Sequence, residues 1–103
     1  MEITQQELKE KINNGEKVIV DFWAEWCSPC RMMKPIFEKV STKNPDLQMY
    51  TLNVMENQDL AVDLGIRSIP TIKAFNDGKE IYSSVGVLNE GDLNKLTETI
   101  IQS

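Results

Sequence analysis

The side chains best suited to chemistry are the two cysteines, Cys27 and Cys30, which lie three positions apart in the stretch WCSPC. Such a close pair is typical of a redox-active dithiol or of half a metal site. Zinc and iron–sulfur sites usually need four ligands, and the chain has no histidine and no second CxxC. Only a dimer sharing a metal would complete such a site. A redox-active pair is therefore favoured over a metal site and over two inert buried thiols.

The residues around the pair predict different roles for the two sulfurs. Pro29 favours the first turn of a helix, which we expect to begin there, with Cys27 just ahead of it and Cys30 inside the turn. The free N–H groups and the dipole at a helix start stabilise a thiolate and lower its pKa below about 8.5. We expect Cys27 to be the more exposed sulfur and the nucleophile. Cys30, shielded in the turn, is expected to be the resolving thiol.

Asp21 is the one charged residue in the apolar run VIVDFWA (18–24), six positions ahead of Cys27. Both faces of this run are apolar, so we predict that Asp21 is buried and that burial raises its pKa. A carboxyl group that titrates near neutrality can accept the proton that Cys30 must lose before it attacks a mixed disulfide. The alternative is that Asp21 bonds backbone groups at the strand end or marks a sheet edge. The proton-acceptor role is favoured.

Two tryptophans flank the motif. Trp23 continues the apolar run, and we interpret it as core packing. Trp26 lies in the loop before Cys27, where a flat apolar side chain can contact a partner.

The pattern of apolar residues and breakers predicts a mixed α/β sheet of four to five strands with helices on both faces. A capping box from Thr4 to Glu7 starts a first helix that ends at Gly15. The further elements are expected as strand 17–24, helix 29–43, strand 47–54, helix 57–65, strands 71–75 and 80–85 joined by NDGK, and a helix from about residue 89. A fifth strand, if present, is a short one at residues 2–4. Strands separated by helices are expected to be parallel and the last two antiparallel.

Composition limits the class of protein. The 103 residues fit one domain spanning 1–103. The chain has 11 basic and 16 acidic residues, which gives a net charge of −5. This balance argues against nucleic acid as a partner, because binding to phosphates requires an excess of Lys and Arg. The start MEITQQELKEK has no leader-like apolar segment, and no run is long enough to cross a membrane. We therefore expect a cytoplasmic monomer without metal or other cofactor.

Taken together, VDFWAEWCSPC, RMMKP, GIRSIPT, NDGK and VGV resemble the thioredoxin family, in order from about residue 15 to the end. The resemblance implies the thioredoxin fold and reduction of protein disulfides. It also implies that a thioredoxin reductase reduces the cysteine pair again after each reaction. This reductase would be either a nicotinamide–flavin enzyme or a ferredoxin-linked one. Two alternatives to a reductant are a disulfide oxidant or isomerase and a binding scaffold with incidental cysteines.

The resemblance also assigns site residues. Asp21 matches the buried proton acceptor of the family, and Pro70 matches a cis proline that faces the cysteines and keeps metals off them. The backbone of Ile69 would then pair with an extended substrate segment. Gly86 and Val87 match a loop that completes an apolar contact rim with Trp26.

Four departures from the family pattern lead to further expectations. Ser28 stands before Pro29 where glycine is usual, and its hydroxyl either donates to the Cys27 thiolate or caps the helix; we predict a modestly less reducing pair. Thr51 replaces a lysine beside Asp21, so Asp21 should be harder to ionise. Ser68 replaces a glycine and narrows the choice of partners. The N-terminus is short, so the first edge strand is expected to be vestigial or absent.

Overall fold

The computed structural model describes residues 1–103 and contains four helices and four strands. In chain order they are α1 (Gln5–Asn13), β1 (Val18–Trp23), α2 (Ser28–Lys43), β2 (Gln48–Asn53), α3 (Gln58–Asp63), β3 (Thr71–Asn76), β4 (Lys79–Val85) and α4 (Glu90–Ile101). The predicted types and order of elements are confirmed, and their bounds differ by one or two residues, as helix and strand ends commonly do.

The strands form one sheet in the order β2-β1-β3-β4. The parallel pairing of β1 with β2 and the antiparallel hairpin β3–β4 are as predicted. The expectation that strands separated by helices are parallel is wrong for β3, which is antiparallel to β1. With six residues, α3 is about 9 Å long, against about 20 Å for a strand of six residues. It does not carry the chain back along the sheet, so β3 starts at the end where β2 stops.

The N-terminal segment contributes one residue to the sheet instead of a fifth strand. Glu2 forms an isolated parallel bridge with Thr51 of β2. The backbone N–H of Ile3 donates to the Thr51 carbonyl at 2.8 Å, and the Thr51 N–H donates to the Met1 carbonyl at 2.9 Å. The expected vestigial edge strand is thus present as a single bridge beside β2.

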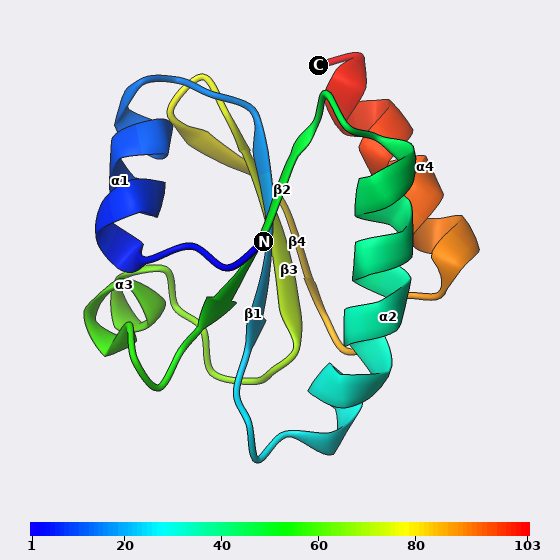
Figure 1. Ribbon diagram of the computed structural model, residues 1–103. Coiled ribbons are helices and arrows are strands. Elements are labelled where there is room, and N and C mark those ends of the chain that lie inside the picture. The colour runs from blue at the N-terminus through cyan, green and yellow to red at the C-terminus, as the bar shows by residue number, and fades with distance from the viewer.

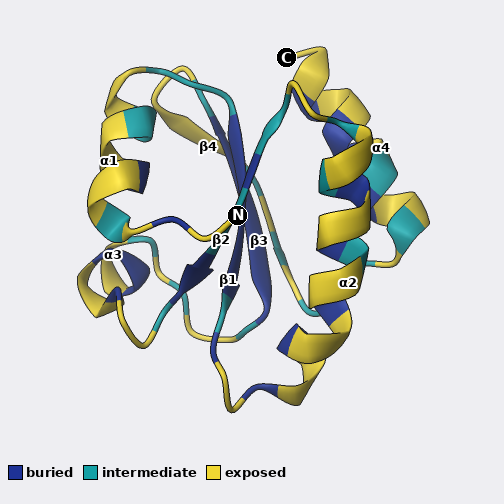
Figure 2. Cartoon of the chain, in the orientation of Figure 1, coloured by how far each residue is buried: buried dark blue, intermediate teal, exposed yellow.

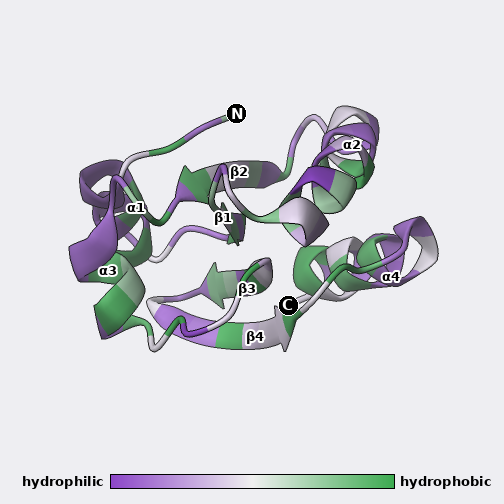
Figure 3. Cartoon of the chain, turned by 90° about the horizontal axis from the view of Figure 1, so that it is seen from below, coloured by the Kyte–Doolittle hydropathy of each residue, from purple (hydrophilic) through white to green (hydrophobic).

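Two cores cover the two faces of the sheet, which lies between α1 with α3 and α2 with α4 (Figure 1; viewed from below in Figure 3). Side chains alternate between the faces along a strand. Val18, Val20 and Phe22 of β1 pack with α1 and α3, whereas Ile19 packs with α2 and α4. Asp21, two positions after Ile19, therefore points to the side of α2. Figure 2 shows β1 buried along most of its length.

Local signals account for the ends of several elements. Thr4 and Glu7 form the predicted capping box of α1, and Asn89 caps α4 by accepting from the Asp92 N–H. The β3–β4 turn places Asp77 and Gly78 at φ values of 57° and 80°. Positive φ at both central residues is the two-residue hairpin turn that NDGK predicts.

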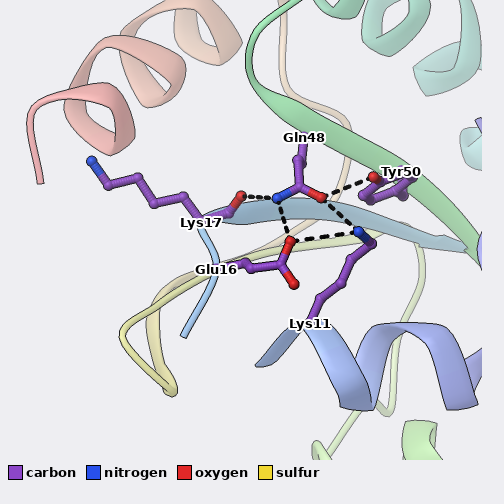
Figure 4. A network of polar contacts seen from close by, with 5 residues as sticks. All are labelled: Lys11, Glu16, Lys17, Gln48 and Tyr50. Carbon is purple, nitrogen blue, oxygen red and sulfur yellow. Dashed lines mark hydrogen bonds and ion pairs between the residues drawn. The ribbon is translucent and has the colours of Figure 1, made fainter. Parts of the chain in front are cut away.

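A polar network attaches the end of α1 to β2 (Figure 4). The Gln48 amide oxygen accepts from Lys11 Nζ at 2.8 Å and from the Tyr50 hydroxyl at 3.0 Å. The Gln48 amide nitrogen donates to Glu16 Oε1 at 2.9 Å and to the Lys17 carbonyl at 3.5 Å. Each polar atom of the Gln48 side chain therefore has two partners, which fixes the α1–β1 connection against the sheet.

Candidate active site

Cys27 and Cys30 are joined in a disulfide at the start of α2, with their Cα atoms 5.3 Å apart. That separation lies within the range that a disulfide spans. The two cysteines that the sequence predicts to be a redox-active pair are thus joined by a disulfide, and the structure describes the oxidised form of the pair.

Cys27 is itself the N-cap of α2. Its Sγ accepts a hydrogen bond from the backbone N–H of Cys30 at 3.2 Å, so the sulfur faces the positive end of the helix dipole. The helix begins at Ser28, one residue before the predicted start at Pro29. The alternative in which Ser28 caps the helix is therefore wrong, because that position belongs to Cys27.

The expectation that Cys27 is the more exposed sulfur is also wrong. Cys27 and Cys30 are each 4% exposed. Both lie in a small apolar cluster with Ala24, against which Trp23, Val54 and Ile69 pack. The Ile69 carbonyl oxygen lies 3.6 Å from Cys27 Sγ, so the segment before β3 covers this sulfur. The two residues are equally buried, and what distinguishes them is their place at the helix start: Cys27 is the N-cap, and Cys30 lies in the first turn.

A cation lies close to the motif: Arg31, which follows Cys30 in the chain and to which the motif alone assigns no role. Arg31 Nη1 donates to the Ser28 hydroxyl oxygen at 3.3 Å, and Arg31 Nη2 donates to the Glu25 carbonyl at 2.8 Å. The spacing of three residues between Ser28 and Arg31 on a helix was the available signal. Pro29 lies exposed between the cysteines and makes no hydrogen bond of its own through its nitrogen.

Asp21 is buried, as predicted, with 1% of its surface exposed. Its Oδ1 has no hydrogen-bond partner. Burial first, and then the negative charge of Glu2, raise the pKa of Asp21 from 3.8 to about 7. β1 lies between β2 and β3, so the alternative in which Asp21 marks a sheet edge is excluded. The result is a buried carboxyl group that changes its charge near neutral pH.

Asp21 and Cys30 line the same cavity, which has a volume of about 890 Å³. Its walls come from the N-terminal segment, β1, β2 and α2, and include Phe37 and Thr51. A space of this size admits water beside both side chains.

Glu2 is the residue of this region that sequence reasoning missed. Its Oε1 accepts from Trp23 Nε1 at 3.0 Å and from the Thr51 hydroxyl, and its Oε2 accepts from the Asn53 N–H at 2.8 Å. Trp23, interpreted as core packing, is only half-buried and donates to Glu2. Nothing in the local sequence marks Glu2, because the bridge to β2 brings it here from 19 residues before Asp21.

The candidate contact residues come from three loops: the one before α2, the one before β3 and the one after β4. Trp26 is 66% exposed and Val87 is 38% exposed. The Ile69–Pro70 peptide bond is cis, as the resemblance implied. The Gly86 N–H donates to the Pro70 carbonyl at 2.8 Å, which holds this loop against the segment that contacts Cys27. Gly86 has φ of 99°, a conformation that favours glycine.

Two further features of the chain are negative findings. No group of three or more Cys, Asp or Glu side chains comes together in a way that could hold a metal ion. No helix combines the length and the apolar character that crossing a bilayer requires.

Comparison with known proteins assigns the family. The thioredoxin family model matches residues 1–99. A thioredoxin of Rickettsia bellii is 38% identical over 93 residues, covering 88% of this chain and 89% of the relative. A thioredoxin of Chlamydia muridarum is 37% identical over 94 residues, covering 91% of each. The solved structure of a mutant thioredoxin from Halobacterium salinarum superimposes with a TM-score of 0.84 at 34% identity, covering 96% of this chain and 87% of that one. The chain has the thioredoxin fold and belongs to the thioredoxin family of thiol–disulfide oxidoreductases, with Cys27–Cys30 as its redox-active pair.

Proposed function

We propose that this chain reduces protein disulfides as an electron carrier, with Cys27 as nucleophile, Cys30 as resolving thiol and Asp21 as proton acceptor. The Cys27 thiolate attacks one sulfur of a substrate disulfide, and the other substrate sulfur leaves as a thiolate that takes up a proton. Cys30 gives its proton to Asp21 and attacks Cys27 Sγ. The second substrate thiolate then leaves. Two electrons pass from the chain to the substrate, and the Cys27–Cys30 disulfide remains.

One observation supports this assignment most strongly: the unpartnered Oδ1 of Asp21 belongs to a residue that lines the same cavity as Cys30. A carboxyl group with a pKa of about 7 is available in both charge states at neutral pH. It can take a proton when Cys30 attacks and return one when the disulfide is reduced again. A carboxyl group in a purely structural role would have hydrogen-bond partners, because an unsatisfied buried polar group destabilises a fold.

The position of Cys27 supports its role as nucleophile. In the reduced form the same Sγ would carry the thiolate, facing the Cys30 N–H and the start of α2. The guanidinium of Arg31 donates to the hydroxyl of Ser28, the residue that follows Cys27. Both features favour the anion, and Ser28 with Pro29 therefore tunes the redox potential in this proposal.

The contact surface proposed for substrates consists of Trp26, Ile69, Pro70, Gly86 and Val87. An extended substrate segment would pair with the backbone at Ile69 and rest on the apolar rim of Trp26 and Val87. The proposal includes a thioredoxin reductase as the electron donor and a monomer as the working form. It also includes a cytoplasmic location, because a reductant of disulfides works where thiols are kept reduced.

Reduction of insulin disulfides with dithiothreitol as electron donor tests the proposal. We expect the wild-type chain to accelerate the reaction, and Cys27→Ser to abolish the acceleration. Cys30→Ser should form a stable mixed disulfide with the substrate through Cys27, which mass spectrometry can locate. Asp21→Asn should form the mixed disulfide normally and resolve it more slowly at pH 7.

Two results would refute parts of this proposal. A rate that does not depend on either cysteine would leave a binding scaffold as the function. A mixed disulfide on Cys30 in Cys27→Ser, with none on Cys27 in Cys30→Ser, would reverse the roles of the two sulfurs. The exposed Asp63→Asn is the matched control for Asp21→Asn and should react as the wild type does.

A further inference from the structure

Glu2, Thr51 and Asp21 lie side by side across three neighbouring segments of backbone. Thr51 is the register partner of Asp21 in the parallel pair β1–β2, and Glu2 bridges the same Thr51 from the other side. Residues directly opposite one another on paired strands project to the same face of a sheet. All three residues line the cavity that Cys30 also lines. The row therefore leads from the surface to the buried carboxyl group.

The carboxylate of Glu2 is held in place although its residue is exposed. Both oxygens accept hydrogen bonds: Oε1 from Trp23 Nε1 and the Thr51 hydroxyl, Oε2 from the Asn53 N–H. Two donors come from β2 and one from β1. A glutamate with this many partners keeps its charge at one place, whereas a free surface glutamate moves through many positions.

No ion pair offsets the charge of Glu2. The ion pairs of the molecule involve Glu16, Glu80 and Glu90 as their carboxylates, and none includes Glu2 or Asp21. Other charged groups line the cavity, at the N-terminus, in the β1–α2 loop, on α2 and after β2: Met1, Glu25, Arg31, Lys34, Glu38 and Glu56. The Arg31 guanidinium is bound to Ser28 and to the Glu25 carbonyl. Glu2 is thus an anchored, unpaired negative charge in the row that ends at Asp21.

We infer that Glu2 is a positioning residue for the proton acceptor: anchored across β2, its negative charge faces Asp21 and opposes loss of the proton that Asp21 takes from Cys30. This inference rests on the proposed function. In the direction of disulfide reduction by the electron donor, Asp21 returns this proton to Cys30, and the charge of Glu2 keeps it available for that step. The raised pKa of Asp21, to which Glu2 contributes after burial, agrees with this arrangement.

The size of the effect follows from the spacing of the strands. Two strand spacings separate the backbones of Glu2 and Asp21 by roughly 10 Å. With an effective dielectric constant between about 20 and 80, two like charges at that distance change the titration midpoint of Asp21 by roughly 0.3 to 1.2 pH units. The lower part of that range applies at high salt, since Glu2 is exposed and salt screens its charge.

Glu2→Gln tests the inference, because it removes the charge and keeps the length of the side chain. Its amide oxygen can still accept from Trp23 and Thr51, whereas its NH2 group cannot accept from the Asn53 N–H, so that one hydrogen bond is lost. The midpoint for Asp21 is measured by ¹³C NMR of its carboxyl carbon in the oxidised protein, where neither cysteine titrates. We expect it to fall by about 0.3 to 1.2 pH units. Glu2→Asp, which keeps the charge, should stay closer to the wild-type midpoint than Glu2→Gln. Glu56→Gln, which removes another carboxylate of the same cavity, should leave the midpoint unchanged.

A second readout connects the charge to function. The pH profile of mixed-disulfide resolution by Cys30 should move to lower pH in Glu2→Gln by the same amount as the NMR midpoint. Thermal unfolding of each variant shows that the fold is retained, and a purely structural role of Glu2 would lower thermal stability without moving either midpoint.

The inference is overturned if Asp21 titrates at the same pH in Glu2→Gln and in the wild type, or if Glu56→Gln moves the midpoint equally. Failure of the proposed function looks different: Asp21→Asn would then have the wild-type pH profile of resolution. In that case the NMR midpoint of Glu2→Gln would still decide whether Glu2 acts on Asp21.

Discussion

Replacing Asp21 with asparagine should change how the stability of the oxidised protein depends on pH. The pKa of Asp21 is raised from 3.8 to about 7 in the folded chain, so the folded state binds a proton that the unfolded state has released. Between these two values the free energy of unfolding falls as pH rises, by about 1.4 kcal/mol for each pH unit. Above pH 7 the loss is complete. Asparagine does not titrate and lacks this slope.

The magnitude follows from the two pKa values. Their difference is about 3 units, which corresponds to roughly 4 kcal/mol between pH 4 and pH 8. This is a large fraction of the 5–15 kcal/mol that is typical of small domains. The free energy of unfolding of Asp21→Asn, relative to the wild type, should therefore increase by about 4 kcal/mol over this range. Other titrating groups are common to both proteins and cancel in the difference.

Urea denaturation of the oxidised wild type and of Asp21→Asn, followed by tryptophan fluorescence from pH 4 to pH 8, measures this difference. Asp63→Asn, on the exposed side of α3, is the matched control, and its difference from the wild type should stay flat. Parallel stability curves for the wild type and Asp21→Asn would refute the reasoning, because they would mean that Asp21 titrates at the same pH in the folded and unfolded chain.

Three other substitutions give separate tests. Ser28→Gly should make the pair more reducing against glutathione, by about 30 mV for each unit by which the pKa of Cys27 rises; an equal potential would show that Ser28 has no influence. Thr51→Lys places a cation opposite Asp21 and should move the pH profile of resolution down by about one unit; an unchanged profile would contradict this. Gln48→Ala breaks the network at the end of α1 and should lower the free energy of unfolding by about 1–2 kcal/mol without slowing insulin reduction. Calorimetry measures the loss of stability, and a loss clearly below this range would contradict the prediction.

The sequence was sufficient to predict the elements, because each has a local signal. The capping box at Thr4, the turn residues in NDGK and the continuous apolar run around Asp21 act within a few residues of one another. The pairing of β3 was mispredicted because it depends on how far α3 carries the chain, and a helix of six residues does not cross the sheet. The shortness of α3 is visible in the sequence, but the general rule that a helix joins parallel strands does not depend on helix length.

In the candidate site, too, features with a local signal could be predicted from the sequence and long-range contacts could not. The burial of Asp21 follows from the apolar residues beside it, so the sequence was enough to predict it. The burial of Cys27 and Cys30 involves Val54 and Ile69, which pack against them from the segments after β2 and before β3. Glu2 acts on Asp21 only because a single bridge joins it to β2. Contacts of this kind connect segments far apart in the chain and leave no periodic pattern to read.

The reactivity of the two sulfurs tests the central claim most directly. The reduced protein is alkylated with iodoacetamide between pH 5 and pH 9, and mass spectrometry locates the label on each cysteine. The helix start predicts that Cys27 reacts first, faster at pH 7 than a free cysteine, with a midpoint below about 8.5. The account would be contradicted if Cys27 were alkylated no faster than free cysteine, or if Cys30 were labelled before Cys27.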